Sequence, residues 1–226
     1  MGDELAAALV FQLVDMCAAA GQAMQDATYA LLRADIAVAE AVIDGQEHAA
    51  ALNSGAEETA FMLLTFRPLM VADLREIANA IQIAADAERM GDLAVRVAEI
   101  ARRHHPDPAV PAQVRGRVAE LSASAVALAH GAQEVLLSRD PRLAVELCRD
   151  GDAVTDLHRG LLAVLIDPRW RYGVAAGVDV ALVSRLFERF AGHAERIAER
   201  FVFPINGQNR NKKVGKPWSK IAGRAV

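Results

Sequence analysis

Apolar residues recur every three or four positions along most of the chain, which is the spacing of one face of an α-helix. One clear instance is the series Ile77, Ala80, Ile81, Ala84 and Ala87. No stretch shows a sustained alternation of apolar and polar residues that would favour a strand over this helical spacing. The pattern therefore predicts an all-α protein.

Prolines mark the ends of the predicted helices, because proline disrupts the interior of a helix. Pro68 separates two helical stretches, and three prolines between 106 and 111 indicate a linker. Asp140 followed by Pro141 is typical of a helix start, with an N-cap and proline at the first position. The predicted helices span 3–33, 35–66, 69–104, 112–138, 140–167 and 173–203.

The sequence also repeats itself. The stretch ERMGDLAVRVAE at 88–99 returns as ERFAGHAERIAE at 188–199, with six of twelve positions identical at an offset of 100. Upstream, the pattern of Leu31, Leu32, Asp35 and Ala39 recurs at an offset of 105. A repeat of about 100 residues and short connections predict two tandem three-helix bundles, over 1–104 and 112–203.

Composition is compatible with this prediction. Apolar residues make up 53% of the chain and aromatic residues only 5%, which suits closely packed helices rich in alanine. The nearest candidate for a membrane span, 5–14, is shorter than the roughly 18 residues that a span needs. Two cysteines, Cys17 and Cys148, form no disulfide framework, so we expect a cytoplasmic protein.

The last 23 residues differ from the rest. The segment 204–226 contains six basic residues and no acidic one, so the remaining chain carries a net charge of −10 when the total is −4. All four lysines of the chain lie in this segment. We interpret 204–226 as a disordered or non-native tail that is dispensable for folding. The acidic body argues against nucleic-acid binding, which requires a basic face.

One pair of carboxylates indicates a possible metal site. Glu88 and Asp92 lie four residues apart, so their side chains share a helix face. Two like charges at this spacing favour a nearby cation, which a metal ion would provide. The alternative is local, because Arg89 and Arg96 could supply the positive charge without a metal.

The second copy of the repeat keeps only part of this pair. Glu188 corresponds to Glu88, but Gly192 stands at the position of Asp92, and His193 follows it. The imidazole of His193 could bind zinc or iron in place of the missing carboxylate. A single histidine on a helix is more often merely part of the packing.

Catalytic patterns are missing from the sequence. It contains no glycine-rich phosphate loop, no Cys-x-x-Cys motif and no Glu-x-x-His motif of a di-iron bundle. Ser122, Ser124 and Ser184 have no histidine or aspartate partner that the sequence identifies. We therefore expect a protein that is not an enzyme.

The repeated stretch resembles a known family. The sequence ERMGDLAVRVAEIA is similar to the Glu-Arg-Ile-Gly-Asp-His-Ala signature of the PhoU family, the phosphate-uptake regulators. Asp73-Leu74-Arg75, some fifteen residues earlier, matches the Asp-Leu-Arg element of that family, whose members also carry two three-helix repeats. The resemblance covers about 5–203 and is greatest to actinobacterial members.

The resemblance implies a cytoplasmic adaptor that negatively regulates phosphate uptake and the phosphate-starvation response. Its expected partners are a sensor histidine kinase and the ATPase of the phosphate ABC transporter, with a second copy of the chain forming a homodimer. Asp73 and Arg75 would lie on the partner-binding surface. The competing hypotheses are a metal-binding helical bundle, as a metal store or metal-dependent enzyme, and a DNA-binding regulator.

Some family members bind multinuclear iron or zinc through paired carboxylates, one set in each repeat. By resemblance, Glu88 and Asp92 would bind metal in the first repeat and Glu188, with His193, in the second. Gly192 departs from the family pattern at this second site, so occupancy should be higher in the first repeat.

Overall fold

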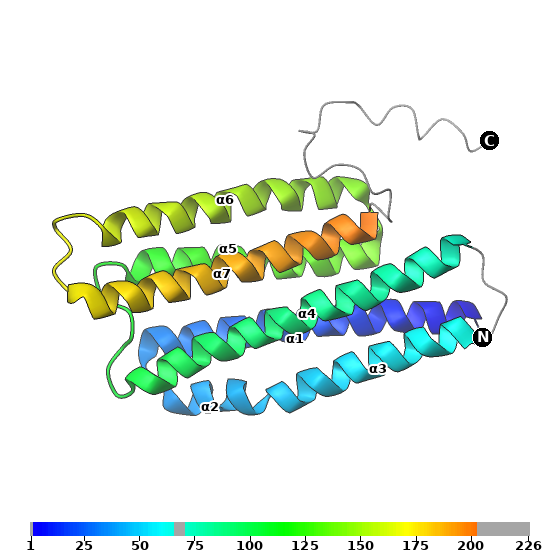
Figure 1. Ribbon diagram of the computed structural model, residues 1–226, viewed down its shortest axis with the longest axis horizontal. Helices are drawn as coiled ribbons and strands as arrows, with labels where there is room; N and C mark the ends of the chain where they lie inside the picture. Colours follow the sequence, from blue (N-terminus) through cyan, green and yellow to red (C-terminus); the bar gives the residue numbers. More distant parts are fainter. Residues whose placement is uncertain (1, 66–70, 203–226) are drawn as a thin grey trace.

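The computed structural model describes residues 2–65 and 71–202, and within these ranges every regular element is an α-helix (Figure 1). The prediction of an all-α fold is confirmed. The predicted tail over 204–226 lies outside the described residues. The helices are α1 (Gly2–Arg33), α2 (Ile36–Asp44), α3 (Gln46–Thr65), α4 (Val71–His104), α5 (Arg115–Ser138), α6 (Pro141–Leu165) and α7 (Gly173–Val202).

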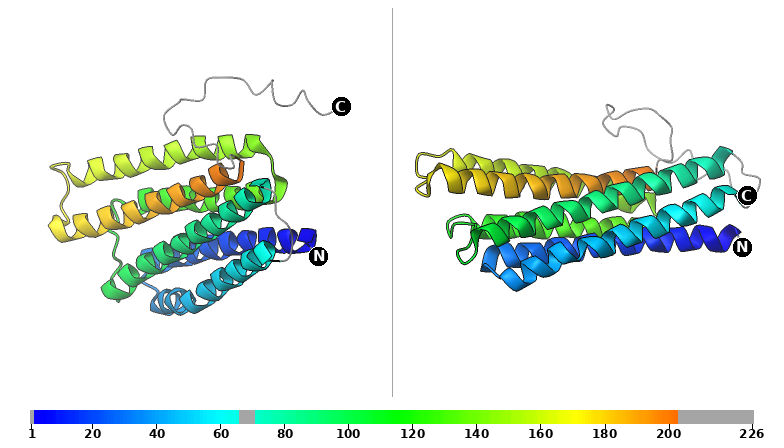
Figure 2. Two further views of the ribbon diagram at one scale, coloured as in Figure 1. Left: turned by 45° about the vertical axis from the view of Figure 1, so that its right-hand side comes forward. Right: turned by 60° about the horizontal axis from the view of Figure 1, so that its bottom comes forward.

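The helices form an elongated bundle in which α1, α4, α7 and α5 contact one another in a ring. Helices α2 and α3 pack on the outside of α1 and α4, while α6 packs on the outside of α5 and α7. Figure 2 shows that all seven run roughly along one axis. We call α1–α4 the first unit and α5–α7 the second unit; each consists of three helical rods, because α2 and α3 together form one.

A duplicated turn joins the first two rods of each unit. Helix α1 is followed by Ala34 and α5 by Arg139, and both residues take the left-handed conformation with φ of 55° and 56°. An aspartate then caps the next helix in each case. Asp35 accepts hydrogen bonds from the backbone N–H of Ala37 and Val38, and Asp140 accepts one from the N–H of residue 142. The repeat read from the sequence is therefore present in the backbone.

The helix predicted over 35–66 is the main error of the sequence analysis. The structure divides it into α2 and α3 at Gly45, which follows Asp44. Glycine costs about 1 kcal/mol relative to alanine inside a helix, which weakens the helix at Gly45, although Gly55 is kept inside α3. A smaller difference is that α5 begins at Arg115, not at 112, because a turn closed by Val114 N–H to Pro111 C=O precedes it.

Helix α1 lies in the core. By length and composition alone it could cross a membrane, and within the described residues it is the one helix of which this is true. Its apolar face instead packs against α4 and α5, with Leu13, Cys17, Met24 and Leu31 buried. A buried hydrogen bond of 2.7 Å between Thr28 Oγ1 and Ser122 Oγ then joins the first unit to the second.

Candidate functional site

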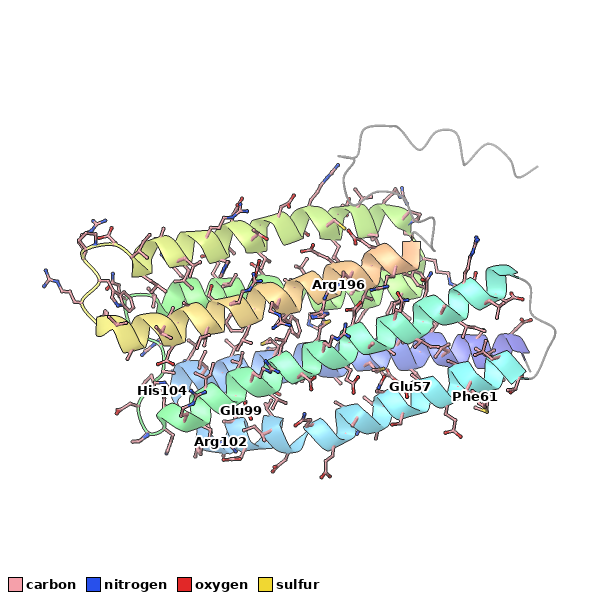
Figure 3. All side chains as sticks on the ribbon, in the orientation of Figure 1. Glu57, Phe61, Glu99, Arg102, His104 and Arg196 are labelled. Carbon is pink, nitrogen blue, oxygen red and sulfur yellow. The ribbon has the colours of Figure 1, made fainter. Side chains whose placement is uncertain are left out.

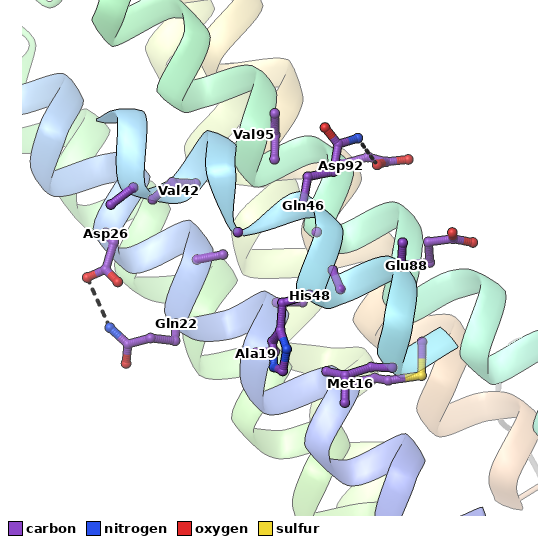
Figure 4. Close-up of a pocket in the computed structure, with 18 of the residues that line it drawn as sticks. Met16, Ala19, Gln22, Asp26, Val42, Gln46, His48, Glu88, Asp92 and Val95 are labelled. Atoms are coloured by element: carbon purple, nitrogen blue, oxygen red, sulfur yellow. Dashed lines mark hydrogen bonds between the residues drawn. The ribbon is translucent and has the colours of Figure 1, made fainter. Parts of the chain in front are cut away.

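A cavity of about 650 Å³ lies between α1, the α2–α3 junction and α4, and we call it the first-unit cavity (Figure 4). Eight of its lining residues are alanines, and Gly45 and Gly91 add two positions without a side chain. Such small residues cannot fill the space between three helices, so a hollow remains where α2 meets α3. The apolar floor includes Met16, Val42 and Val95, all of which are buried.

Polar side chains surround the mouth of this cavity. Figure 4 shows Gln22 and Asp26 of α1 on one rim, with the amide of Gln22 donating to Asp26 at 3.0 Å. On the other rim Gln46 donates a long hydrogen bond of 3.5 Å to Asp92, and His48 lies nearby on α3. The cavity thus combines an apolar interior with a partly acidic edge.

The two carboxylates predicted as metal ligands both line this cavity. Glu88 is half-buried and Asp92 is exposed, and both come from α4. Two oxygen ligands from one helix could hold one side of a cation. Among the described residues, however, no group of three or more histidine, cysteine, aspartate or glutamate side chains converges. Metal binding by Glu88 and Asp92 therefore stays a prediction, and the described side chains do not by themselves complete a site.

In the second unit the corresponding residues make different contacts. Glu188 forms an ion pair with Arg185, one turn earlier on α7. Glu195, which corresponds to Val95, lies over Gly151 of α6 so closely that any side chain at Gly151 would displace it. Burial is the largest cause of the raised pKa of Glu195, about 7, and the nearby negative charges of Glu199 and Asp152 raise it further.

His193 does not join Glu188 but faces α4, where it meets a buried carboxylate. Its Nδ1 lies 2.8 Å from Oδ1 of Asp86, which is 1% exposed. Arg196 and Arg200 donate through Nε to the same carboxylate, at 3.3 and 3.0 Å, and Arg89 lies 3.8 Å away. We call these five residues the Asp86 cluster.

Electrostatics of the Asp86 cluster indicate an ionised aspartate. Burial alone would raise the pKa of Asp86, but the hydrogen bond from His193 and the charges of Arg196 and Arg200 together lower it. An ionised carboxylate only accepts hydrogen bonds, so Nδ1 of His193 carries the proton in this contact. The positive charges here disfavour a metal ion beside His193.

Sequence reasoning missed Asp86, because it lies on α4 while its hydrogen-bond partners on α7 lie more than 100 residues later. The available signal was an aspartate on the apolar stripe of a helix, where a charge needs a partner. Two serine contacts were also missed. Ser122 bonds to Thr28, and Ser184 Oγ lies 2.6 Å from Nδ1 of His158. Ser184 is fully buried, so this pair is a packing contact.

The predicted partner-binding residues lie at the opposite end of α4 from the linker. Asp73 is partly exposed, Arg75 is exposed, and Leu74 between them is 45% exposed. Phe61 and Leu64 near the end of α3 are exposed as well, at 66% and 40%. Figure 3 shows Phe61 at the same end of the bundle as the start of α4. We call these five residues the α3–α4 end surface.

The sequence matches one protein family along most of its length. The model of the PhoU domain family matches residues 13–101 and 118–201. The phosphate-specific transport system accessory protein PhoU homolog 2 of Mycobacterium tuberculosis is 50% identical over 196 residues, covering 87% of this chain and 92% of that protein. Homolog 1 from the same organism is 47% identical over 199 residues, with coverages of 88% and 90%.

Solved structures share the fold at lower sequence identity. The crystal structure of PhoU from Pseudomonas aeruginosa superimposes with a TM-score of 0.80 at 21% identity, over 92% of this chain and 100% of that chain. That of the phosphate transport system regulatory protein PhoU from Streptococcus pneumoniae gives a TM-score of 0.81 at 18% identity, over 92% and 98%.

Proposed function

The chain belongs to the PhoU family, and on this premise we propose that it is a cytoplasmic adaptor that negatively regulates phosphate uptake. In this role it couples the ATPase of the phosphate ABC transporter to a sensor histidine kinase, and so restrains the phosphate-starvation response when phosphate is plentiful. The main observation behind this proposal is that the family model matches both halves of the chain. Identities of 47–50% to accessory proteins of phosphate-specific transport support it.

The shape of the molecule suits an adaptor. Helices of 24 to 34 residues, such as α5 and α4, form a long bundle whose two ends are far apart (Figures 1 and 2). Such a body can contact two proteins at once without any chemical step. A homodimer, which we include in the proposal, would present each surface twice.

We assign one partner to the α3–α4 end surface. Exposed aromatic and aliphatic side chains beside charged ones are typical of protein interfaces. Here Phe61, Leu64 and Leu74 provide the apolar contact, and Asp73 and Arg75 flank Leu74 on α4. Loss of an exposed leucine from such a surface removes binding energy while leaving the core intact.

The test is a pull-down of the full chain from cells grown with and without phosphate, followed by identification of the captured proteins. The kinase and the transporter ATPase should be enriched with the wild-type chain, and the Leu74→Ala variant should lose at least one of them. Leu182→Ala is the matched control, since Leu182 is an equally exposed leucine on α7. Capture of neither protein would contradict the adaptor role.

A genetic experiment tests the regulatory direction separately. Deleting the gene should raise alkaline phosphatase or transporter expression in phosphate-rich medium. Unchanged expression, in a strain without a second copy of the family, would contradict negative regulation even if binding were observed.

A further inference from the structure

The seam between α4 and α7 carries more positive than negative charge, in a protein whose body is acidic. In the Asp86 cluster a single carboxylate faces three guanidinium groups, those of Arg89, Arg196 and Arg200. Even with His193 neutral, the cluster has a surplus of two positive charges. Figure 3 shows Arg196 in the seam between the two helices.

Asp86 orients the guanidinium groups of Arg196 and Arg200 but does not occupy all of their N–H donors. Arg196 and Arg200 each donate their Nε to the carboxylate, so the N–H donors of their Nη groups are not used in that contact. One Nη of Arg200 contacts Gln82, and one of Arg196 contacts His193. Since a guanidinium carries five N–H donors, both arginines keep donors for a further acceptor within the described structure.

Arg89 is placed differently from the other two. Its Nη1 lies 3.8 Å from Asp86, beyond hydrogen-bond distance, and its side chain is 62% exposed. Arg196 and Arg200 are about one-third exposed. Because Arg89 makes no direct hydrogen bond to Asp86 and is more exposed than Arg196 and Arg200, its charge contributes little to holding α4 against α7 and remains accessible from solvent.

Glu195 of α7 offsets this surplus only in part. Arg196 also acts on Glu195, whose pKa is nevertheless raised to about 7 by burial and by Glu199. Near neutral pH Glu195 is then ionised only in part of the molecules. Asp86 accepts from His193, Arg196 and Arg200, whereas Arg89 at 3.8 Å makes no direct hydrogen bond to it.

We propose that Arg89, Arg196 and Arg200 form a binding site for a phosphate-type oxyanion at the α4–α7 seam. Guanidinium forks match the oxygen spacing of phosphate, and several arginines from two helices can bind one tetrahedral anion. The anion is either free inorganic phosphate or a phosphoryl group on another molecule. This site does not depend on the proposed adaptor role, because it rests on the geometry of the cluster alone.

Isothermal titration calorimetry of the full chain tests the proposal, in a low-salt buffer that contains no other oxyanion. Inorganic phosphate and O-phosphoserine are titrated separately, and the tighter of the two identifies the source of the phosphoryl group. Malonate serves as a dicarboxylate control. Arg89→Gln removes one charge from the site, and Arg189→Gln removes one charge from the corresponding exposed position of the second repeat.

We expect phosphate or phosphoserine binding to the wild-type chain and to Arg189→Gln with equal affinity, and an affinity about tenfold lower for Arg89→Gln, as for loss of one charge-assisted hydrogen bond. The melting temperature of Arg89→Gln should match that of the wild type, which excludes unfolding as the cause. No binding by the wild type would overturn the proposal. Equal weakening by Arg189→Gln would overturn it by showing a general charge effect, and malonate binding as tight as phosphate would overturn the assignment to phosphate.

Discussion

Helices α4 and α7 carry the same repeated stretch, yet one lies beside a cavity and the other is packed tightly. The difference follows from two positions. Ala87 and Gly91 border the first-unit cavity, whereas the second copy has Phe187 and Ala191, both buried. The additional volume of Phe187 fills space that Ala87 leaves empty. The repeat has thus kept the backbone plan, while the side chains leave a cavity of about 650 Å³ in the first unit and a smaller one of about 320 Å³, between α5 and α6, in the second.

The charges of the two copies have diverged as well. Asp86 has Leu186 as its counterpart, so the buried carboxylate between α4 and α7 comes from the first unit alone. Val95, a buried wall of the cavity, has Glu195 as its counterpart, and that carboxyl group crowds Gly151. A pseudo-symmetric pair of helices therefore has an asymmetric interface, held by one aspartate and by arginines of the second copy.

Replacing Asp86 with its counterpart is the most disruptive way to make the copies alike. In Asp86→Leu the guanidinium groups of Arg196 and Arg200 and the N–H of His193 lose a buried acceptor. Removing one partner of a buried ion pair typically costs 3–5 kcal/mol, and because both arginines reach solvent we expect about 3 kcal/mol. Urea denaturation measures this loss; a change below about 1 kcal/mol would show that the cluster does not hold the units together.

The pH dependence gives a control for this prediction. The pKa of Asp86 is lowered in the folded state, so its ionised form contributes stability above its unfolded pKa and loses it as pH falls through the folded value. The stability difference between wild type and Asp86→Asn should therefore be constant near neutral pH and shrink below about pH 4. A difference that persists at lower pH would contradict an ionic origin.

Much of the fold could be predicted from the sequence, because helical spacing, prolines and the repeat are local signals. The caps at Asp35 and Asp140 belong to this class. The break at Gly45 could not be located, since glycine inside a helix is often tolerated and only the packing of α2 and α3 on α1 and α4 decides whether the helix divides.

The candidate site was predictable only in part, for a physical reason. Glu88 and Asp92 share a face of one helix, so spacing alone placed them together, and the structure places both at the cavity. The contact of Asp86 with His193 joins two helices across the seam between the units. No local pattern encodes such a contact, and the same holds for Glu195 over Gly151.

Gly91 and its counterpart Ala191 allow the packing of the two units to be compared by exchanging glycine and alanine between them. Gly91→Ala should stabilise the protein by about 1 kcal/mol, the difference in helix propensity, because a Cβ at Gly91 would lie 3.9 Å from that of Ala49. Ala191→Gly should cost about 2 kcal/mol, since a buried methyl group is lost in addition. Thermal denaturation of both variants measures the effects. Equal and opposite changes would show that the two units are packed alike.

The diverged pair Val95 and Glu195 predicts a pH effect confined to the second unit. The pKa of Glu195 is raised to about 7, so the protein loses stability as pH rises from its unfolded pKa through this value. Relative to Glu195→Gln, the wild type should therefore become less stable between about pH 5 and pH 8. Melting curves across this range test it, with Glu120→Gln at an exposed position of α5 as control. Parallel pH profiles of wild type and Glu195→Gln would contradict the assignment.

The smallest expected effect concerns metal content. Asp92 and Glu88 line the mouth of the cavity, where solvent water could complete the coordination shell of a cation, whereas Glu188 is already paired with Arg185. We therefore expect Asp92→Ala to lower the iron or zinc content of the purified protein and Glu188→Ala to leave it unchanged. Elemental analysis of the three proteins decides between the copies. Equal content in wild type and Asp92→Ala would reject the site in the first unit. No metal in any of them would favour the alternative in which arginines such as Arg96 supply the positive charge.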